Sequence, residues 1–192
     1  MSARGEATRT RLLTAALDLI PEVGWGAVST RAVAERAGLN PALVHYHFPT
    51  VADLLTTAAL DFCRSFGSSW LDHLDGADLP ADLPADLPAD LPAGLTRLIT
   101  QLDAHPADAP ASRLMSEIVL AAPRHPALRT GLAAVVADLR ARLADWLRAG
   151  GAADPEATAA LALAAIEGIA LHRAIGAALD TTTYAEALIR TV

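Results

Sequence analysis

The joint between two short helical patterns, GLNP at residues 38–41, constrains the fold more than any other part of the chain. Gly38 tolerates the left-handed conformation that a tight helix exit requires. Asn40 is a good N-cap, and Pro41 suits the first position of a helix, where its missing N–H costs nothing. The sequence therefore predicts two short helices, 30–37 and 41–47, joined by a sharp turn.

Helical periodicity continues on both sides of this joint. Residues 6–20 repeat apolar side chains at helical spacing, and Pro21 and Gly24 are expected to end that helix. Thr50 and Asp53 have the spacing of a capping box and should start a long fourth helix. Further helices are predicted at 94–104, 111–121, 126–149, 155–179 and 183–190. Strand patterns do not occur, so the expected fold class is all-α, with a three-helix head and a larger helical body.

A tetrapeptide repeat, ADLPADLPADLPADLPA, occupies residues 77–93. Proline at every fourth position removes helical hydrogen bonds and clashes with the preceding turn, so a regular helix is excluded. We predict an extended or turn-rich linker with an acidic face. A proline-rich docking motif for a partner is the functional alternative. The predicted domains are a head at 1–50 and a body at 51–192 that contains this linker.

Composition favours a soluble globular protein. Hydrophobic residues make up 53% of the chain and charged residues 19%, which is enough apolar surface for a core. The single Cys63 excludes an internal disulfide and fits a reducing compartment. Asp18 interrupts the short apolar run that follows the N-terminal arginines, so an export signal is not expected. The longest apolar stretch is interrupted by charges, so we expect a cytoplasmic protein without a membrane span.

Charge is distributed unevenly along the chain. The net charge is −7, yet residues 1–48 contain five arginines and only four acidic side chains. A mildly basic head on an acidic body is compatible with a head that meets phosphate groups.

Patterns for catalysis or metal binding are weak. The sequence has no Ser/His/Asp spacing, Gly-rich phosphate loop or paired-carboxylate motif, so neither an enzyme nor a cofactor is expected. His45 and His47 lie two residues apart and point about 200° from each other on a helix, which does not suit shared metal ligation. Cys63 has no neighbouring base and is predicted to be a buried, inert thiol.

The two short helices ahead of a long one have the proportions of a helix-turn-helix. Small Ala34 would let the third helix approach the second closely. The expected shared core consists of Val33, Ala37, Leu39, Val44 and Phe48. The outward face of the third helix, which would enter the major groove, carries Pro41, Ala42, His45 and Tyr46.

The run VSTRAVAERAGLNPALVHYHFPTVADLL resembles the DNA-binding head of the TetR family of transcriptional regulators, over residues 6 to about 56. It has the family's Thr-Arg helix start, its Ala…Ala-Gly turn and its closing aromatic-x-His-Phe. Farther along, PALRTGLAAVVADLRARLADWLRAG and ATAALALAAIEGIALHRAIG are similar to the two long helices through which the family dimerises.

The resemblance implies specific DNA contacts. Thr30 and Arg31 match positions that grip phosphate, and Pro41 begins an apolar surface suited to thymine methyl groups. The implied DNA-binding residues are Thr30, Arg31, Asn40, Pro41, Ala42, Leu43, His45, Tyr46 and His47. His47 has a second interpretation, as a capping or packing histidine above Phe48. Where the family usually has Lys after Phe-Pro-Thr, this chain has Val51, and the residues that could replace that phosphate contact are Arg4, Arg9 and Arg11.

The resemblance also implies a function. We expect a repressor that binds an inverted-repeat DNA operator as a homodimer, formed through residues 126–149 and 155–179, and that a small-molecule effector releases. Candidate effector-binding residues are Phe62, Phe66, Trp70, Met115, Glu117 and His172. Ordinary core packing is the alternative for the aromatic residues and Met115, and an inter-helix or inter-subunit hydrogen bond is the alternative for Glu117. A DNA-binding protein of the same fold that answers to a protein partner, or to no ligand, is the alternative function.

Overall fold

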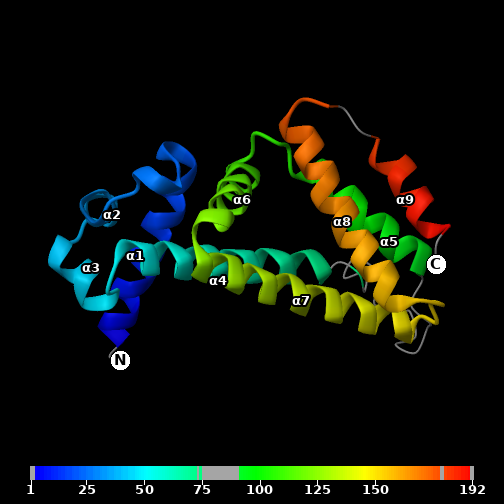
Figure 1. Cartoon of the computed structure of the whole chain (residues 1–192), viewed down its shortest axis with the longest axis horizontal. Helices are drawn as coiled ribbons and strands as arrows, with labels where there is room; N and C mark the ends of the chain where they lie inside the picture. The colour runs from blue at the N-terminus through cyan, green and yellow to red at the C-terminus, as the bar shows by residue number, and fades with distance from the viewer. Residues whose placement is uncertain (1–2, 73, 75–90, 178–179, 191–192) are drawn as a thin grey trace. The chain divides into compact units, whose positions relative to one another are not determined.

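The computed structural model describes residues 3–72, 74, 91–177 and 180–190. Every regular element in these ranges is a helix, which confirms the all-α fold class (Figure 1). The α-helices are α1 (Ala3–Val23), α2 (Thr30–Ala37), α3 (Pro41–His47), α4 (Val51–Leu71), α5 (Leu91–Thr100), α6 (Pro110–Ala121), α7 (Pro126–Ala149), α8 (Pro155–Ala174) and α9 (Thr181–Ile189). Short 3-10 turns are η1 (Trp25–Ala27), η2 (Gln101–Ala104) and η3 (Ala122–Arg124).

The end of α1 differs from the prediction. The helix continues through Pro21 to Val23 instead of stopping at the proline. In the last turn a proline removes one backbone donor without blocking the residues that follow it. The helix ends at Gly24, which has a positive φ of 80° and whose N–H donates to the Ile20 carbonyl at 2.9 Å.

The end of α8 also differs, because the predicted helix 155–179 stops at Ala174. Gly176 follows with a φ of 79°, and the Ala177 N–H donates to the His172 carbonyl at 2.9 Å. This left-handed turn closes the helix and satisfies its last carbonyl groups. Residues 178–179 of the prediction lie outside the described residues.

Most of the proline repeat, residues 77–90, lies outside the described residues. Its last three residues, assigned by the prediction to the linker, instead form the first turn of α5, which begins at Leu91. Pro92 fits there because the N–H groups of a first helical turn have no intrahelical partner. The predicted helix 94–104 is therefore α5 followed by the tighter turn η2.

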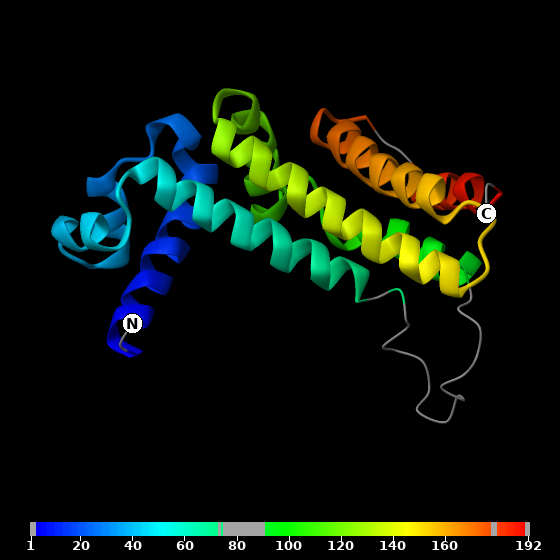
Figure 2. The same cartoon turned by 60° about the horizontal axis from the view of Figure 1, so that its bottom comes forward.

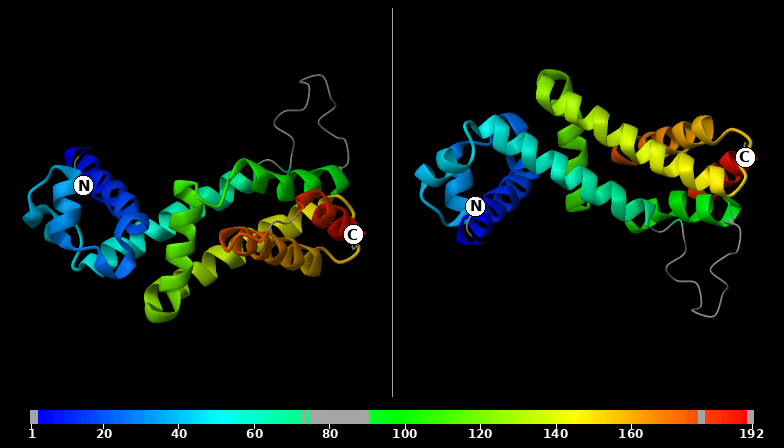
Figure 3. Two further views of the ribbon diagram at one scale, coloured as in Figure 1. Left: turned by 90° about the horizontal axis from the view of Figure 1, so that it is seen from above. Right: turned by 90° about the horizontal axis from the view of Figure 1, so that it is seen from below.

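Contacts divide the chain into two compact units. One consists of Met1–Arg64 and Arg113–Ala133, and the other of Ser65–Ser112 and Ala134–Val192. In the first unit α1 packs on α2 and α2 on α3 (Figure 3). In the second unit α5 packs against α9 and α8, and α8 also contacts α9 (Figure 2). The functional boundary predicted at residue 50 stays a prediction.

The core of the first unit contains most of the expected helix-turn-helix residues. Val33 and Val44 are completely buried, and Ala37 and Phe48 are nearly so. Leu39 is only half-buried, since it follows Gly38 in the turn between the helices. Ala34, a small residue of α2, has no exposed surface.

The core of the second unit is built around Trp70 and the leucines of α5 and α7. The Trp70 indole is 8% exposed and its N–H donates to the Leu98 carbonyl at 2.9 Å. Its ring centroid lies 5.4 Å from that of Phe66 and 5.0 Å from that of His105. Trp70 is thus a hydrogen-bonded core residue, which favours the packing alternative over an effector contact.

Candidate nucleic-acid interface

Residues 38–41 form the turn before α3 through interactions with their close neighbours in the sequence. Gly38 adopts a φ of 62°, and its N–H donates to the Glu35 carbonyl at 3.0 Å. The Asn40 side chain accepts from the Ala42 N–H at 2.9 Å, and Pro41 occupies the first helical position. These are the interactions expected of a left-handed helix exit followed by an N-cap. Both short helices therefore have the predicted bounds.

The outward face of α3 is exposed along its length. Val44 is buried and anchors the helix, whereas Tyr46 is 81% exposed and Leu43 is 36% exposed. His45 is exposed and His47 is half-buried. The rings of Tyr46 and His47 meet edge to face, with centroids 5.1 Å apart. The helix thus presents hydrogen-bonding rings and short apolar groups to solvent, as a DNA-reading surface requires.

The beginning of α2 presents groups that suit a phosphate. Ser29 caps this helix by accepting from the Ala32 N–H at 3.2 Å. Thr30 is half-buried and Arg31 is exposed. Helix N-terminal N–H groups together with a guanidinium are a common phosphate-binding combination.

The predicted capping box at the start of α4 is confirmed. The Asp53 N–H donates to the Thr50 hydroxyl at 3.1 Å, and the Thr50 N–H donates to the Asp53 carboxylate at 3.1 Å. Two otherwise unpaired backbone donors are satisfied reciprocally. Val51, the position at which the family usually has Lys, is half-buried.

Arginines around the helix-turn-helix make contacts within the protein. The Arg11 guanidinium donates to the Ala37 carbonyl, and that of Arg9 lies 5.2 Å from the centroid of the Phe48 ring. Arg36 donates to both carboxylate oxygens of Glu22 at 3.0 and 2.5 Å, and this hydrogen bonding lowers the pKa of Glu22. Local sequence patterns contain no signal for these contacts, because the partners are far apart in the chain.

The candidate effector residues are divided between the two compact units, and their role in binding an effector stays a prediction. Phe62, Met115 and Glu117 belong to the first unit, and the remaining three to the second. His172 is exposed on α8. The predicted inert thiol agrees with the structure, since burial raises the pKa of Cys63 to about 11.

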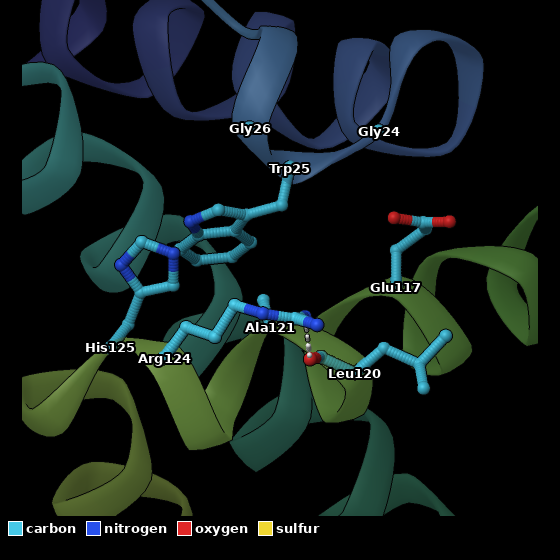
Figure 4. A pocket seen from close by; sticks show the side chains of 8 residues that line it. All are labelled: Gly24, Trp25, Gly26, Glu117, Leu120, Ala121, Arg124 and His125. Atoms are coloured by element: carbon cyan, nitrogen blue, oxygen red, sulfur yellow. Dashed lines mark hydrogen bonds between the residues drawn. The ribbon is translucent and has the colours of Figure 1, made fainter.

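A shallow depression of about 280 Å³ in the first unit includes one of these residues, Glu117. Its lining consists of Gly24, Trp25, Gly26, Glu117, Leu120, Ala121, Arg124 and His125. Figure 4 shows the carboxylate of Glu117 pointing toward Gly24, and the rings of Trp25 and His125 facing each other. The two ring centroids are 5.4 Å apart. The sequence predicted only Glu117 here, because the lining comes from segments about a hundred residues apart.

Two family sequence models match the chain. "Bacterial regulatory proteins, tetR family" matches residues 12–58, and "Tetracyclin repressor-like, C-terminal domain" matches residues 86–192, which is more than half of the chain. An uncharacterised HTH-type transcriptional regulator of Mycobacterium tuberculosis is 36% identical over 61 residues. That alignment spans 32% of this chain and 31% of the relative.

Solved structures share the whole fold. A transcriptional regulator of Streptomyces coelicolor A3(2) superposes with a TM-score of 0.72 at 29% identity, covering 96% of this chain and 97% of the other. The multidrug binding protein EbrR, solved with imidazole, superposes with a TM-score of 0.71 at 26% identity. The superposition covers 100% of this chain and 94% of EbrR. With the helix-turn-helix formed by α2 and α3, these matches establish that the chain belongs to the TetR family of bacterial transcriptional regulators.

Proposed function

We propose that this protein is a repressor that binds an inverted-repeat operator as a homodimer and leaves it when a small molecule binds. The observation that carries the proposal is the exposed outer face of α3, which Tyr46 dominates, on a helix anchored by buried Val44. A buried anchor with an exposed face is what a recognition helix needs to enter the major groove.

The proposed DNA contacts fall into two groups. Thr30 and Arg31 would hold a phosphate and set the register of the head, without reading sequence. Pro41, Ala42 and Leu43 would meet thymine methyl groups, while His45, Tyr46 and His47 donate or accept hydrogen bonds. Asn40 accepts from the Ala42 N–H through its side-chain oxygen, so its amide group can donate to DNA.

The proposed dimer forms through α7 and α8. Apolar or small residues recur on α8 at alternating spacings of four and three residues, which is the period of paired helices. This stripe, which we call the α8 stripe, consists of Ala157, Leu161, Ala164, Gly168 and Leu171 on the helix and of Ile175 directly after it. On α7, Ala134, Ala137 and Ala141 have similar spacing and are also exposed.

Exposure of the α8 stripe supports a protein partner. Leu161, Leu171 and Ile175 are 52%, 63% and 73% exposed, and nothing lies within 4 Å of a Cβ placed on Gly168. Among the described helices, only α8 is long and apolar enough to cross a bilayer by length and composition. We assign this apolar surface to dimerisation, because the small residues allow a second helix to approach closely.

Effector control is proposed from the family and from one structural relative. EbrR is named for multidrug binding, and its fold covers all of this chain. In the proposed mechanism the ligand tilts α4 and changes the spacing of the two α3 helices, so that they no longer fit both half-sites. The coupling free energy between ligand and DNA binding is the difference in ligand-binding free energy between the two spacings of the α3 helices, typically about 1–3 kcal/mol.

The test is selection of duplexes by the full-length protein from a randomised DNA pool. We expect enrichment of an inverted repeat with half-site centres about 34–36 Å apart. Enrichment of an isolated half-site would contradict the dimer, and no enrichment at low salt would refute the proposal. The selected complex is then exposed to a library of small organic molecules that includes cationic aromatic dyes. Specific DNA binding that no compound reverses would favour control by a protein partner, or no effector.

A further inference from the structure

Two arginines of α1 contact the segments that precede and follow α3. Arg11 contacts the turn where the chain enters α3, and Arg9 contacts Phe48, where it leaves. Neither arginine belongs to the helix-turn-helix itself. Both nevertheless lie on the basic N-terminal segment in which the sequence suggested phosphate contacts.

The contact at the entry joins a guanidinium to the end of α2. Arg11 donates to the Ala37 carbonyl, and the same nitrogen lies 3.4 Å from the Gly38 carbonyl oxygen. The last carbonyls of a helix lack intrahelical partners and carry partial negative charge, so a cation is favoured there. A Cβ placed on Gly38 would lie 3.3 Å from this nitrogen, so the guanidinium rests directly on the turn.

The contact at the exit is an aromatic one. The Arg9 guanidinium carbon lies 5.2 Å from the centroid of the Phe48 ring, within the range of a cation–π interaction. Phe48 is 4% exposed and caps α3, since its N–H donates to the Val44 carbonyl at 2.8 Å. The end of α3 is therefore fixed in the core while its outer face stays exposed.

We propose that Arg11 is a positioning residue for base recognition: by holding the Ala37 and Gly38 carbonyls it sets the direction in which α3 leaves the turn. The inference rests on the proposed recognition face of α3. Hydrogen-bond donors that discriminate bases must meet particular atoms, so a small rotation of α3 removes base contacts while leaving the phosphate contacts in place. Loss of Arg11 should therefore reduce sequence discrimination without reducing the number of neutralised phosphates.

The test uses the full-length protein, a duplex selected by the wild type, and a scrambled duplex of equal length and composition. Affinities for both are measured over a series of salt concentrations. For Arg11→Gln we expect the ratio of the two affinities to fall about tenfold, the scale of one lost base contact. The slope of log affinity against log salt should be unchanged, because it reports the number of phosphates neutralised.

Arg31→Gln is the matched control, since it removes the same charge from a position proposed to hold phosphate. It should weaken both duplexes alike and reduce the salt slope by about 2, which is about 1 for each protomer of the proposed dimer. If Arg11→Gln behaves in this way, Arg11 is a phosphate contact and the inference is overturned. If the wild-type protein binds all duplexes with equal affinity, the proposed function and the inference are both refuted.

Two further measurements keep the inference testable if Arg11→Gln folds poorly. Arg11→Lys retains the charge on a side chain one bond shorter than the guanidinium nitrogen that contacts both carbonyls, so positioning predicts a lower affinity ratio at an unchanged slope. An unchanged ratio would overturn the inference. In the DNA-free protein, hydrogen exchange at the Leu39 amide, which donates to the Ala34 carbonyl at 2.9 Å, should accelerate in Arg11→Lys. Unaltered exchange would count against a role in holding the turn.

Discussion

Helices α3 and α8 both expose apolar side chains, but what accompanies those side chains differs. On α3, exposed Leu43 and Tyr46 stand beside a histidine on a helix of seven residues. On α8, exposed leucines alternate with alanine and glycine along a helix of 20 residues. Rings with hydrogen-bonding groups suit a groove of bases and phosphates, whereas aliphatic and small residues at the period of paired helices suit a second helix. Exposure alone does not distinguish the two proposed partners, whereas the neighbouring residue types support DNA for α3 and a second helix for α8.

An arginine makes contacts near each of these helices, and the groups that the two arginines contact differ in their chemistry. Arg11 donates to neutral carbonyl groups at the turn before α3. Arg173, on α8, donates to the Leu102 carbonyl at 2.5 Å and forms an ion pair with Asp103. The anchor of α8 therefore includes a group that acid can neutralise, whereas the anchor of α3 does not.

The largest effect is expected from a charge in the α8 stripe. In a twofold interface Leu171→Glu introduces two carboxylates, each costing several kcal/mol when buried without a partner. The dimer dissociation constant should rise about a thousandfold or more, equivalent to about 4 kcal/mol, measured by sedimentation velocity over a concentration series. Ala170→Glu adds the same charge to a neighbouring exposed position that points away from the stripe, and it should leave the dimer intact. Equal dissociation by both variants would remove the distinction between α8 and other exposed surfaces.

A second expected effect separates DNA binding from assembly. Tyr46→Ala should weaken binding to the selected duplex by about 10- to 100-fold, the scale of one to two base contacts, without changing the thermal midpoint or the oligomeric state. Tyr184 is the other tyrosine of the chain and is 39% exposed on α9, so Tyr184→Ala is a matched control. For both variants, gel shift measures the affinity for DNA and calorimetry measures the thermal midpoint. Full affinity in Tyr46→Ala would contradict the assignment of α3 as the recognition helix.

Glycine substitutions should have opposite signs in the two regions. Gly38→Ala places a Cβ in the left-handed conformation beside Arg11 and should destabilise the fold by about 1 kcal/mol or more. Gly168→Ala adds a good helix former with no atom near the new Cβ, and should stabilise the chain by about 1 kcal/mol. Urea unfolding in the Leu171→Glu background isolates folding from association. The same Gly168→Ala change should weaken the dimer; an unchanged dimer dissociation constant would place Gly168 outside the interface.

The smallest effect is a dependence on pH. Hydrogen bonds from Arg173 and Thr181 lower the pKa of Asp103 below its usual value. The ionised form is therefore favoured in the folded state, and its contribution is present at neutral pH and is lost as pH falls through the acidic range of carboxyl groups. The contribution should be a fraction of a kcal/mol, since the Asp103 side chain is 55% exposed. Stability measured from pH 7 to pH 3 should fall less steeply in Asp103→Asn, and an identical slope would mean that this pair contributes nothing.

Most of the helix boundaries and the exposed outer face of α3 could be predicted because they depend on nearby residues. Gly38, Asn40 and the Thr50–Asp53 pair each act within about four residues, so their effect is visible in the sequence. Three boundaries were wrong. Those at Pro21 and Gly176 involve residues that are compatible with a late helical turn as well as with a helix end. The third is the start of α5 at Leu91, where Pro92 is compatible with a first helical turn as well as with a linker.

The amino-acid sequence by itself determined the all-α class, the capped joint before α3 and the TetR resemblance, since helical period and capping chemistry are local. Only the tertiary structure decided that Arg11 rests on the end of α2, that Trp70 is a hydrogen-bonded core residue, and that Glu117 faces Gly24. These contacts join residues that are 26 to about 90 positions apart. Such pairs are set by how helices pack, and helical packing depends on the fit of whole surfaces, which no short stretch of sequence specifies.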